Sequence, residues 1–295
     1  MDKLKGIAYA AASSSTFGLA PLFTLLLLGA GYSAFEVLSY RWGVASLALI
    51  TVGIASGRDF RLNRKDALTV FWLSLLRAAT SLSLVIAYRE IASGVASTIH
   101  FMYPLAVAGA MMLFFSEKKS TRTIAAIGTS IVGAVLLSAG NAGVADGDRA
   151  TGILAACISV FSYGSYIIGV RKSRAAKLEP TVLTCYVMAL GAVIFILCGS
   201  ITTGIRLETD GMNWLYILGL ALPATAVSNM ALVKAIRYIG PTLTSLFGAL
   251  EPLTAVVIGI TVLREPFTVQ GAAGIALVVL AVSLAFLPAS REKIN

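Results

Sequence analysis

The stretch ALEPLTAVVIGITVLREPFT, at residues 249–268, contains two Glu-Pro pairs with an almost entirely apolar run between them. Proline removes a backbone hydrogen bond from a helix, and a carboxyl group in an apolar run is costly to bury without a partner. Glu251-Pro252 therefore predicts a bend beside a polar cavity, whereas Glu265-Pro266 predicts the end of the same helix.

The composition of the whole chain points to a membrane. Of its 295 residues, 58% are hydrophobic and 13% are charged, whereas soluble domains carry about 25% charged residues. Such a chain cannot cover a water-facing surface. The net charge of +9 does not indicate a nucleic-acid partner, because the basic residues lie between apolar runs rather than on one face.

Apolar runs of the length that crosses a bilayer recur along the chain. The first begins after Lys3 and Lys5 and is too long for a signal peptide, so we interpret it as an uncleaved span. We predict an all-α integral membrane protein with ten transmembrane helices, at about 5–29, 35–56, 67–90, 93–115, 121–140, 150–170, 179–203, 213–236, 240–263 and 268–288.

The linkers between these runs alternate in charge. Most of the 23 Lys and Arg residues fall in every second linker and at the two termini, and the other linkers hold only Arg89, Arg149, Arg206 and Arg264. Cytoplasmic loops of membrane proteins are the ones enriched in basic residues. We therefore expect both termini in the cytoplasm and the protein in the cytoplasmic (inner) membrane.

The chain repeats itself. A shift of 148 residues places REIASGVASTIHFMYPLAVAGAMMLFFSEKKS (89–120) on RYIGPTLTSLFGALEPLTAVVIGITVLREPFT (237–268), so that Pro104 meets Pro252 and Glu117 meets Glu265. We predict two five-helix repeats, at residues 1–145 and 146–295. Because five is odd, the second repeat would enter the membrane from the opposite side, as in many secondary transporters.

Each half has a proline in its fourth span, an apolar run that ends in glutamate, and a fifth span rich in small residues (GTSIVGAVLL and GAAGIALVVL). With Arg41 in SYRWGVASLAL of the second span, the chain resembles the drug/metabolite transporter superfamily, in its ten-span EamA-like family. The resemblance covers nearly the whole chain. It implies export of amino acids and other small metabolites, although the family also includes importers and exchangers. Arg77 and His100 are not part of the family pattern.

Polar residues inside the spans are the candidate site. An arginine near the centre of a span costs about 2.5–3.5 kcal/mol to insert, so Arg77 should face the bundle interior. It either receives a carboxylate of the solute or forms a structural ion pair with an acid such as Glu251. Glu251 in turn either pairs with an arginine or contacts an amine. His100, the only histidine, either couples a proton to transport, lines the cavity or is structural.

The candidate substrate-binding residues are Arg77, His100, Glu251, Ser81, Arg41, Tyr103, Ser14, Tyr163 and Asn229, and the candidate hinges are Pro104 and Pro252. Buried arginines with a buried glutamate favour a zwitterionic or carboxylate-bearing solute, amino acids first. A broad amine, drug or nucleobase efflux transporter is the alternative. A membrane-embedded lipid-modifying enzyme is a remote third, because the spans offer no acidic cluster and no nucleophile beside a base. We expect no metal and no cofactor, alternating access with proton or exchange coupling, and a monomer or homodimer.

Overall fold

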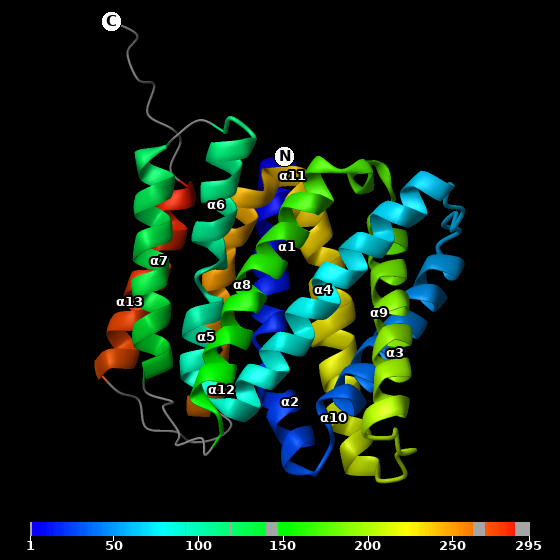
Figure 1. Ribbon diagram of the computed structural model, residues 1–295. Coiled ribbons are helices and arrows are strands. Elements are labelled where there is room, and N and C mark those ends of the chain that lie inside the picture. Colours follow the sequence, from blue (N-terminus) through cyan, green and yellow to red (C-terminus); the bar gives the residue numbers. More distant parts are fainter. Residues whose placement is uncertain (1, 92, 118–119, 140–146, 262–268, 287–295) are drawn as a thin grey trace, which may run out of the picture.

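The computed structural model describes residues 2–91, 93–117, 120–139, 147–261 and 269–286, and every regular element among them is helical. The α-helices are α1 (Asp2–Phe17), α2 (Ala20–Gly29), α3 (Ala34–Ala55), α4 (Arg64–Glu90), α5 (Ser93–His100), α6 (Tyr103–Phe114), α7 (Thr121–Ala139), α8 (Arg149–Lys172), α9 (Pro180–Thr202), α10 (Gly211–Ala221), α11 (Ser228–Leu246), α12 (Leu250–Thr261) and α13 (Val269–Phe286). They form one bundle (Figure 1).

The starts of several helices are set by local sequence. Ser33 caps α3 through a capping box with Glu36, and Asn63 caps α4 by accepting a hydrogen bond from the backbone N–H of Asp66. The Glu179 side chain caps α9, which begins with Pro180 at a position where proline's missing N–H costs nothing. These caps place the helix ends close to the predicted boundaries.

Seven helical stretches among the described residues are long and apolar enough to cross a membrane. One of them, Gly211–Thr254, contains the predicted span 213–236 and the first part of the predicted span 240–263, and Gly240 breaks it with a φ of 81°. The predicted spans at 121–140 and 268–288 coincide with the shorter apolar helices Thr121–Leu136 and Val269–Ala281. The all-helical class is thus confirmed for the described residues, and the count of ten crossings stays a prediction.

Both candidate hinge prolines lie where a helix is interrupted. The chain leaves helix between α5 and α6, and Pro104 follows in the first turn of α6. A 3-10 turn, Phe247–Ala249, separates α11 from α12, and Pro252 follows in the first turn of α12. A hinge function stays a prediction. The second Glu-Pro pair, Glu265-Pro266, lies outside the described residues.

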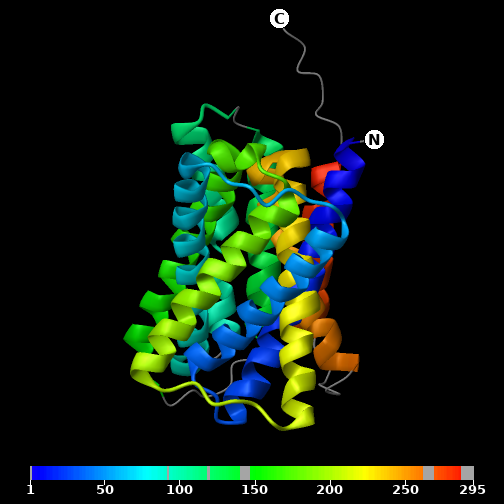
Figure 2. The same cartoon turned by 90° about the vertical axis from the view of Figure 1, so that its right-hand side faces the viewer.

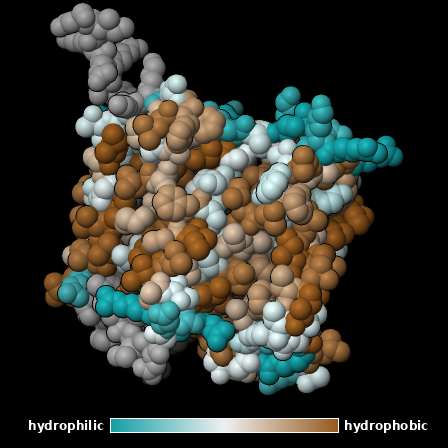
Figure 3. Space-filling view, in the orientation of Figure 1, coloured by the Kyte–Doolittle hydropathy of each residue, from teal (hydrophilic) through white to brown (hydrophobic). Residues whose placement is uncertain are grey.

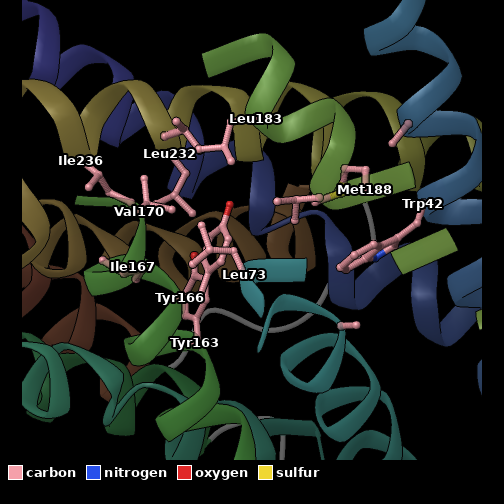
Figure 4. Close-up of a cluster of buried hydrophobic side chains, with 14 of the residues drawn as sticks. Trp42, Leu73, Tyr163, Tyr166, Ile167, Val170, Leu183, Met188, Leu232 and Ile236 are labelled. Carbon is pink, nitrogen blue, oxygen red and sulfur yellow. The ribbon is translucent and has the colours of Figure 1, made fainter. Parts of the chain in front are cut away.

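The helices pack in four long pairs: α3 with α9, α7 with α13, α4 with α8, and α1 with α11. Each pair joins a helix of the first predicted repeat to one of the second. The largest apolar cluster draws most of its residues from α3, α4, α8, α9 and α11, and it includes Trp42, Leu73, Tyr166 and Met188 (Figure 4).

The surface agrees with a membrane environment. Hydrophobic residues cover the middle of the face in Figure 3, and hydrophilic residues gather near the two ends. The connections α3–α4 and α8–α9 lie at the end of the bundle that holds the N-terminus, which we call the N-terminal end (Figures 1 and 2). The connections α2–α3 and α9–α10 lie at the opposite end.

A substitution at Gly191 of α9 tests how closely α3 and α9 pack. A Cβ atom there would lie 2.0 Å from the ring of Trp42, and Trp42 is itself held edge-on against Phe195 at 5.2 Å between ring centroids. We expect Gly191→Ala to destabilise the protein by about 1–3 kcal/mol through overpacking. The readout is the thermal midpoint of the purified protein in detergent.

Gly43 is the matched control, because a Cβ atom at this position of α3 would meet nothing within 4 Å. Alanine is a better helix former than glycine by about 1 kcal/mol, so Gly43→Ala should hold or raise the midpoint. Equal midpoints for the two variants would contradict the packing described.

Candidate functional site

Arg77 lies in the middle of α4, with 1% of its surface exposed. Its Nε donates to Asn229 Oδ1 at 2.9 Å, and its Nη1 donates to Ser81 Oγ at 3.3 Å. Three aromatic rings surround the guanidinium, with centroids 5.1 Å (Tyr163), 5.4 Å (Phe17) and 5.9 Å (Tyr166) from Cζ. Rings at this distance attract a cation through their quadrupole. The Arg77 charge is therefore stabilised by neutral groups of the protein itself.

Arg41 of α3 is also buried but is less completely satisfied. Its Nε donates to Thr225 Oγ1 at 2.6 Å, and its Cζ lies 5.5 Å from the Phe17 ring that Arg77 also contacts. Its Nη2 is buried and has no hydrogen-bond partner within the described part of the chain. A buried donor without a partner is costly, so this nitrogen is an available binding group for an anionic oxygen.

The hydrogen-bond partners of the two arginines lie in and just after a π-helix, Leu222–Val227. Thr225 accepts from Arg41 and donates to the Leu220 carbonyl at 2.7 Å. One turn on, the Asn229 amide donates to the Thr225 carbonyl at 2.8 Å and its oxygen accepts from Arg77. Short π-helices frequently mark functional sites. Here the π-helical turn and the start of α11 place Thr225 against Arg41 and Asn229 against Arg77.

The two guanidinium groups line one enclosed cavity of about 20 Å³. That volume holds about one water molecule and is too small for an organic solute. The walls come from α1 to α4, and the lining residues include Phe17, Thr24, Arg41, Arg77, Thr80, Ser81 and Tyr88. The site is thus closed in this structure.

Glu251 lies at the start of α12, with 7% of its surface exposed, and is not among the residues that line the cavity. Its carboxyl group lies near the Tyr103 hydroxyl and in the electrostatic field of Arg77. The sequence left open a direct Arg77–Glu251 ion pair. Three ion pairs within 4 Å occur among the described residues, and none includes Arg77 or Glu251. The prediction of a direct ion pair between Arg77 and Glu251 is wrong, because Asn229 and Ser81 accept the hydrogen bonds of Arg77 instead.

His100 packs beside the site rather than on the cavity wall. Its Nδ1 is 2.8 Å from Ser159 Oγ, and its ring stacks on Tyr163 with centroids 5.4 Å apart. Tyr103 contacts both rings, at 5.3 Å from His100 and 4.7 Å from Tyr163. His100 Nε2 is buried and has no hydrogen-bond partner among the described residues.

The structure brings most of the candidate residues together. Arg41, Arg77 and Ser81 line the cavity, Asn229 and Tyr163 contact Arg77, and Glu251 and Tyr103 form a second layer with His100. Ser14 is buried on α1 but is not among the residues that line the cavity.

Sequence reasoning missed Thr225 and Ser159. Thr225 is a single hydroxyl in an apolar run, and Pro223 beside it is the only local signal of irregular helix. Ser159 was visible only as one of many small polar residues, which is why its bond to His100 could not be foreseen.

The fold and the site define the class: an all-helical integral membrane protein with buried cationic groups at its centre, as expected for a carrier of small molecules. The EamA-like transporter family matches residues 4–139 and 150–287, so the chain belongs to that family, in two repeats. The resemblance drawn from the sequence is therefore confirmed. The EamA-like family is a family of transporters.

A solved structure described only as the crystal structure of a protein is similar to the chain with a TM-score of 0.79. The likeness covers 97% of this chain and 96% of the other, at 18% sequence identity. It shows the fold alone. No curated protein matches the chain.

Proposed function

We propose that the protein is a secondary transporter of small carboxylate-bearing solutes, with amino acids as the first class, and that it works as an exporter. The observation that carries this proposal is Arg41, a residue that lines the cavity and whose buried Nη2 has no hydrogen-bond partner among the described residues. A carboxylate oxygen would satisfy this donor with a charge-assisted hydrogen bond, which is about twice as strong as a neutral one.

The charge balance of the site supports the same solute class. Arg41 and Arg77 each bring a positive charge, and Glu251 is an acidic group that lies in the electrostatic field of Arg77. Whether Glu251 is ionised or protonated, the site stays net positive. A carboxylate reduces that charge and a zwitterion leaves it unchanged, whereas a cationic drug or amine would increase it. We therefore rank amine and drug efflux below carboxylate transport.

The helix pairing supports two inverted repeats. If the halves exchange by a twofold rotation, α3 exchanges with α9 and α7 with α13, so each of these pairs maps on itself. The α4–α8 pair then maps on the α11–α1 pair. All four pairs occur in the bundle. Inverted repeats that rock about a midplane site are a common basis of alternating access.

The two ends of the bundle differ in a way that alternating access requires. At the N-terminal end, Arg174 donates to Asp66 at 2.7 Å and Arg58 lies 3.8 Å from Glu179, which link the two repeats. Thr242 also donates to Glu117 at 2.7 Å. At the opposite end a broad depression enters the surface. We propose that the N-terminal end faces the cytoplasm and that this structure is closed at that end. The helix breaks before Pro104 and Pro252 would be the points at which the helices bend.

The test is counterflow in proteoliposomes. Vesicles are loaded with one unlabelled amino acid at a time, and uptake of the labelled form is compared with that of vesicles without protein. Saturable uptake of amino acids or other carboxylates, with no uptake of their decarboxylated amines, would support the proposal. Uptake of amines alone would contradict it and move the function to the alternative class.

A substitution at His100 distinguishes solute exchange from proton-coupled transport. Because its ring packs among Tyr103 and Tyr163 and its Nδ1 is held by Ser159, we expect His100→Asn to slow counterflow but to leave the shape of its pH profile unchanged. Asparagine can keep the hydrogen bond to Ser159. A profile that becomes flat in the variant would instead assign proton coupling to His100.

A further inference from the structure

The end of the bundle opposite the N-terminus carries a second hollow, which we call the outer depression. It has a volume of about 910 Å³, large enough for a metabolite-sized solute. Its polar lining includes Ser33, Glu36, Arg89, Thr203 and Arg206. None of these residues belongs to the buried site around Arg41 and Arg77.

The outer depression continues the axis of the buried cavity. On α2 the cavity is lined by Thr24 and the depression by Leu28, four residues further on. On α4 the corresponding residues are Val85 and Arg89, again four apart. Residues four apart lie on one face of a helix, about 6 Å apart along its axis. The two hollows therefore follow one another along the same helix faces.

A third helix shows the same order. Arg41 of α3 lines the cavity, and Glu36, nearer the start of that helix, lines the depression. Three helices thus contribute residues to both hollows. On α4 the two linings follow directly, because Tyr88 lines the cavity and the next residue, Arg89, lines the depression.

The charges of the depression match those of the inner site. Glu36 is already engaged, because it lies 3.2 Å from Arg206 Nε and caps α3. Arg206 also lies over the Tyr32 ring, with 4.4 Å from Cζ to the centroid. Arg89 is exposed at the edge of the hollow and has no ion-pair partner within 4 Å among the described residues. The depression is net positive, and Arg89 carries its unpaired charge.

We propose that the outer depression is an anion-holding station on the transport path, where Arg89 binds the carboxylate of a solute that enters or leaves the Arg41 site. This inference rests on the proposed function, because the station serves the same solute class. A concave surface with one sign of charge concentrates counterions and raises their rates of encounter by about 10-fold or more at low salt.

The first experiment measures the local field without any transport. Thr203 is exposed in the depression, so Thr203→Cys, with the three native cysteines replaced by alanine, is labelled with an anionic or a cationic methanethiosulfonate. We expect the anionic reagent to be favoured at low salt and Arg89→Gln to reduce that preference about 10-fold. Arg149→Gln is the matched control, because Arg149 is exposed near the same end but does not line the depression. An unchanged preference in Arg89→Gln would overturn the proposal.

The second experiment is counterflow of the best amino acid from the panel. We expect Arg89→Gln to raise the half-saturation concentration at least about 5-fold with little change in maximal flux, and Arg149→Gln to leave both unchanged. Altered labelling with an unaltered half-saturation concentration would also overturn the station. If the wild-type protein carries no carboxylate at all, the proposed function fails, and the labelling result still decides whether the depression holds anions.

Discussion

Replacing Arg41 with methionine should abolish saturable carboxylate uptake while leaving the protein folded. Arg41 lines the cavity, and its buried Nη2 is a donor without a hydrogen-bond partner in the described part of the chain. Loss of one member of a desolvated, hydrogen-bonded charge pair costs about 2–5 kcal/mol of binding, or about 30-fold to several thousand-fold in affinity. We expect counterflow in proteoliposomes to fall to the level of vesicles without protein at solute concentrations that saturate the wild type.

The fold should tolerate this change because Arg41 supports little structure. Thr225 Oγ1 loses the hydrogen bond that it accepts from Arg41 but still donates to the Leu220 carbonyl, and methionine fills much of the space of the arginine stem. A thermal midpoint close to that of the wild type is therefore expected. Arg41→Lys is the matched control: it keeps the charge without the planar fork, so part of the uptake should remain. Wild-type uptake by Arg41→Met would rule out Arg41 as the carboxylate receptor.

The cost of charge in a membrane explains which parts of this site were predictable. Arg41 and Arg77 had to face the bundle interior, whatever the fold, and both are buried. The helix starts were equally readable, because Ser33-x-x-Glu36 is a local signal that the structure contains as a capping box. The repeat was readable from the spacing that both halves share, Pro104 to Glu117 and Pro252 to Glu265, and the resemblance to the family rested on these residues together with Arg41 and the small-residue spans.

The division of roles between the two arginines could not be predicted. In the sequence each is a single cation in an apolar run, and Glu251 is the obvious partner for either. Their actual partners, Thr225 and Asn229, lie 184 and 152 residues further along the chain. Which arginine is satisfied depends on a π-helical turn that sets where those two side chains point. No local pattern encodes that turn apart from a proline.

Arg77 should behave in the opposite way to Arg41, with a large effect on stability. Arg77→Ala would leave Asn229 Oδ1 buried without its donor, which costs about 1–3 kcal/mol. It would also remove the cation that contacts Phe17, Tyr163 and Tyr166, at about 0.5–2 kcal/mol for each desolvated contact. We expect a loss of at least about 3 kcal/mol, and a thermal midpoint in detergent about 10 °C lower.

Two variants of the same helix make this result interpretable. Arg64→Ala, at the exposed start of α4, should leave the midpoint within about 1–2 °C of the wild type. Arg77→Lys keeps a charge near the three rings but cannot reach Asn229 and Ser81 together, so it should fall between the wild type and Arg77→Ala. If Arg77→Ala instead kept its midpoint and lost uptake, Arg77 would be the receptor for the solute. The hydrogen bonds of the two guanidinium groups therefore predict opposite results. Arg41→Met should be stable and inactive, because Arg41 keeps a donor free of protein partners among the described residues, and Arg77→Ala should be unstable, because Arg77 is bonded to Asn229 and Ser81.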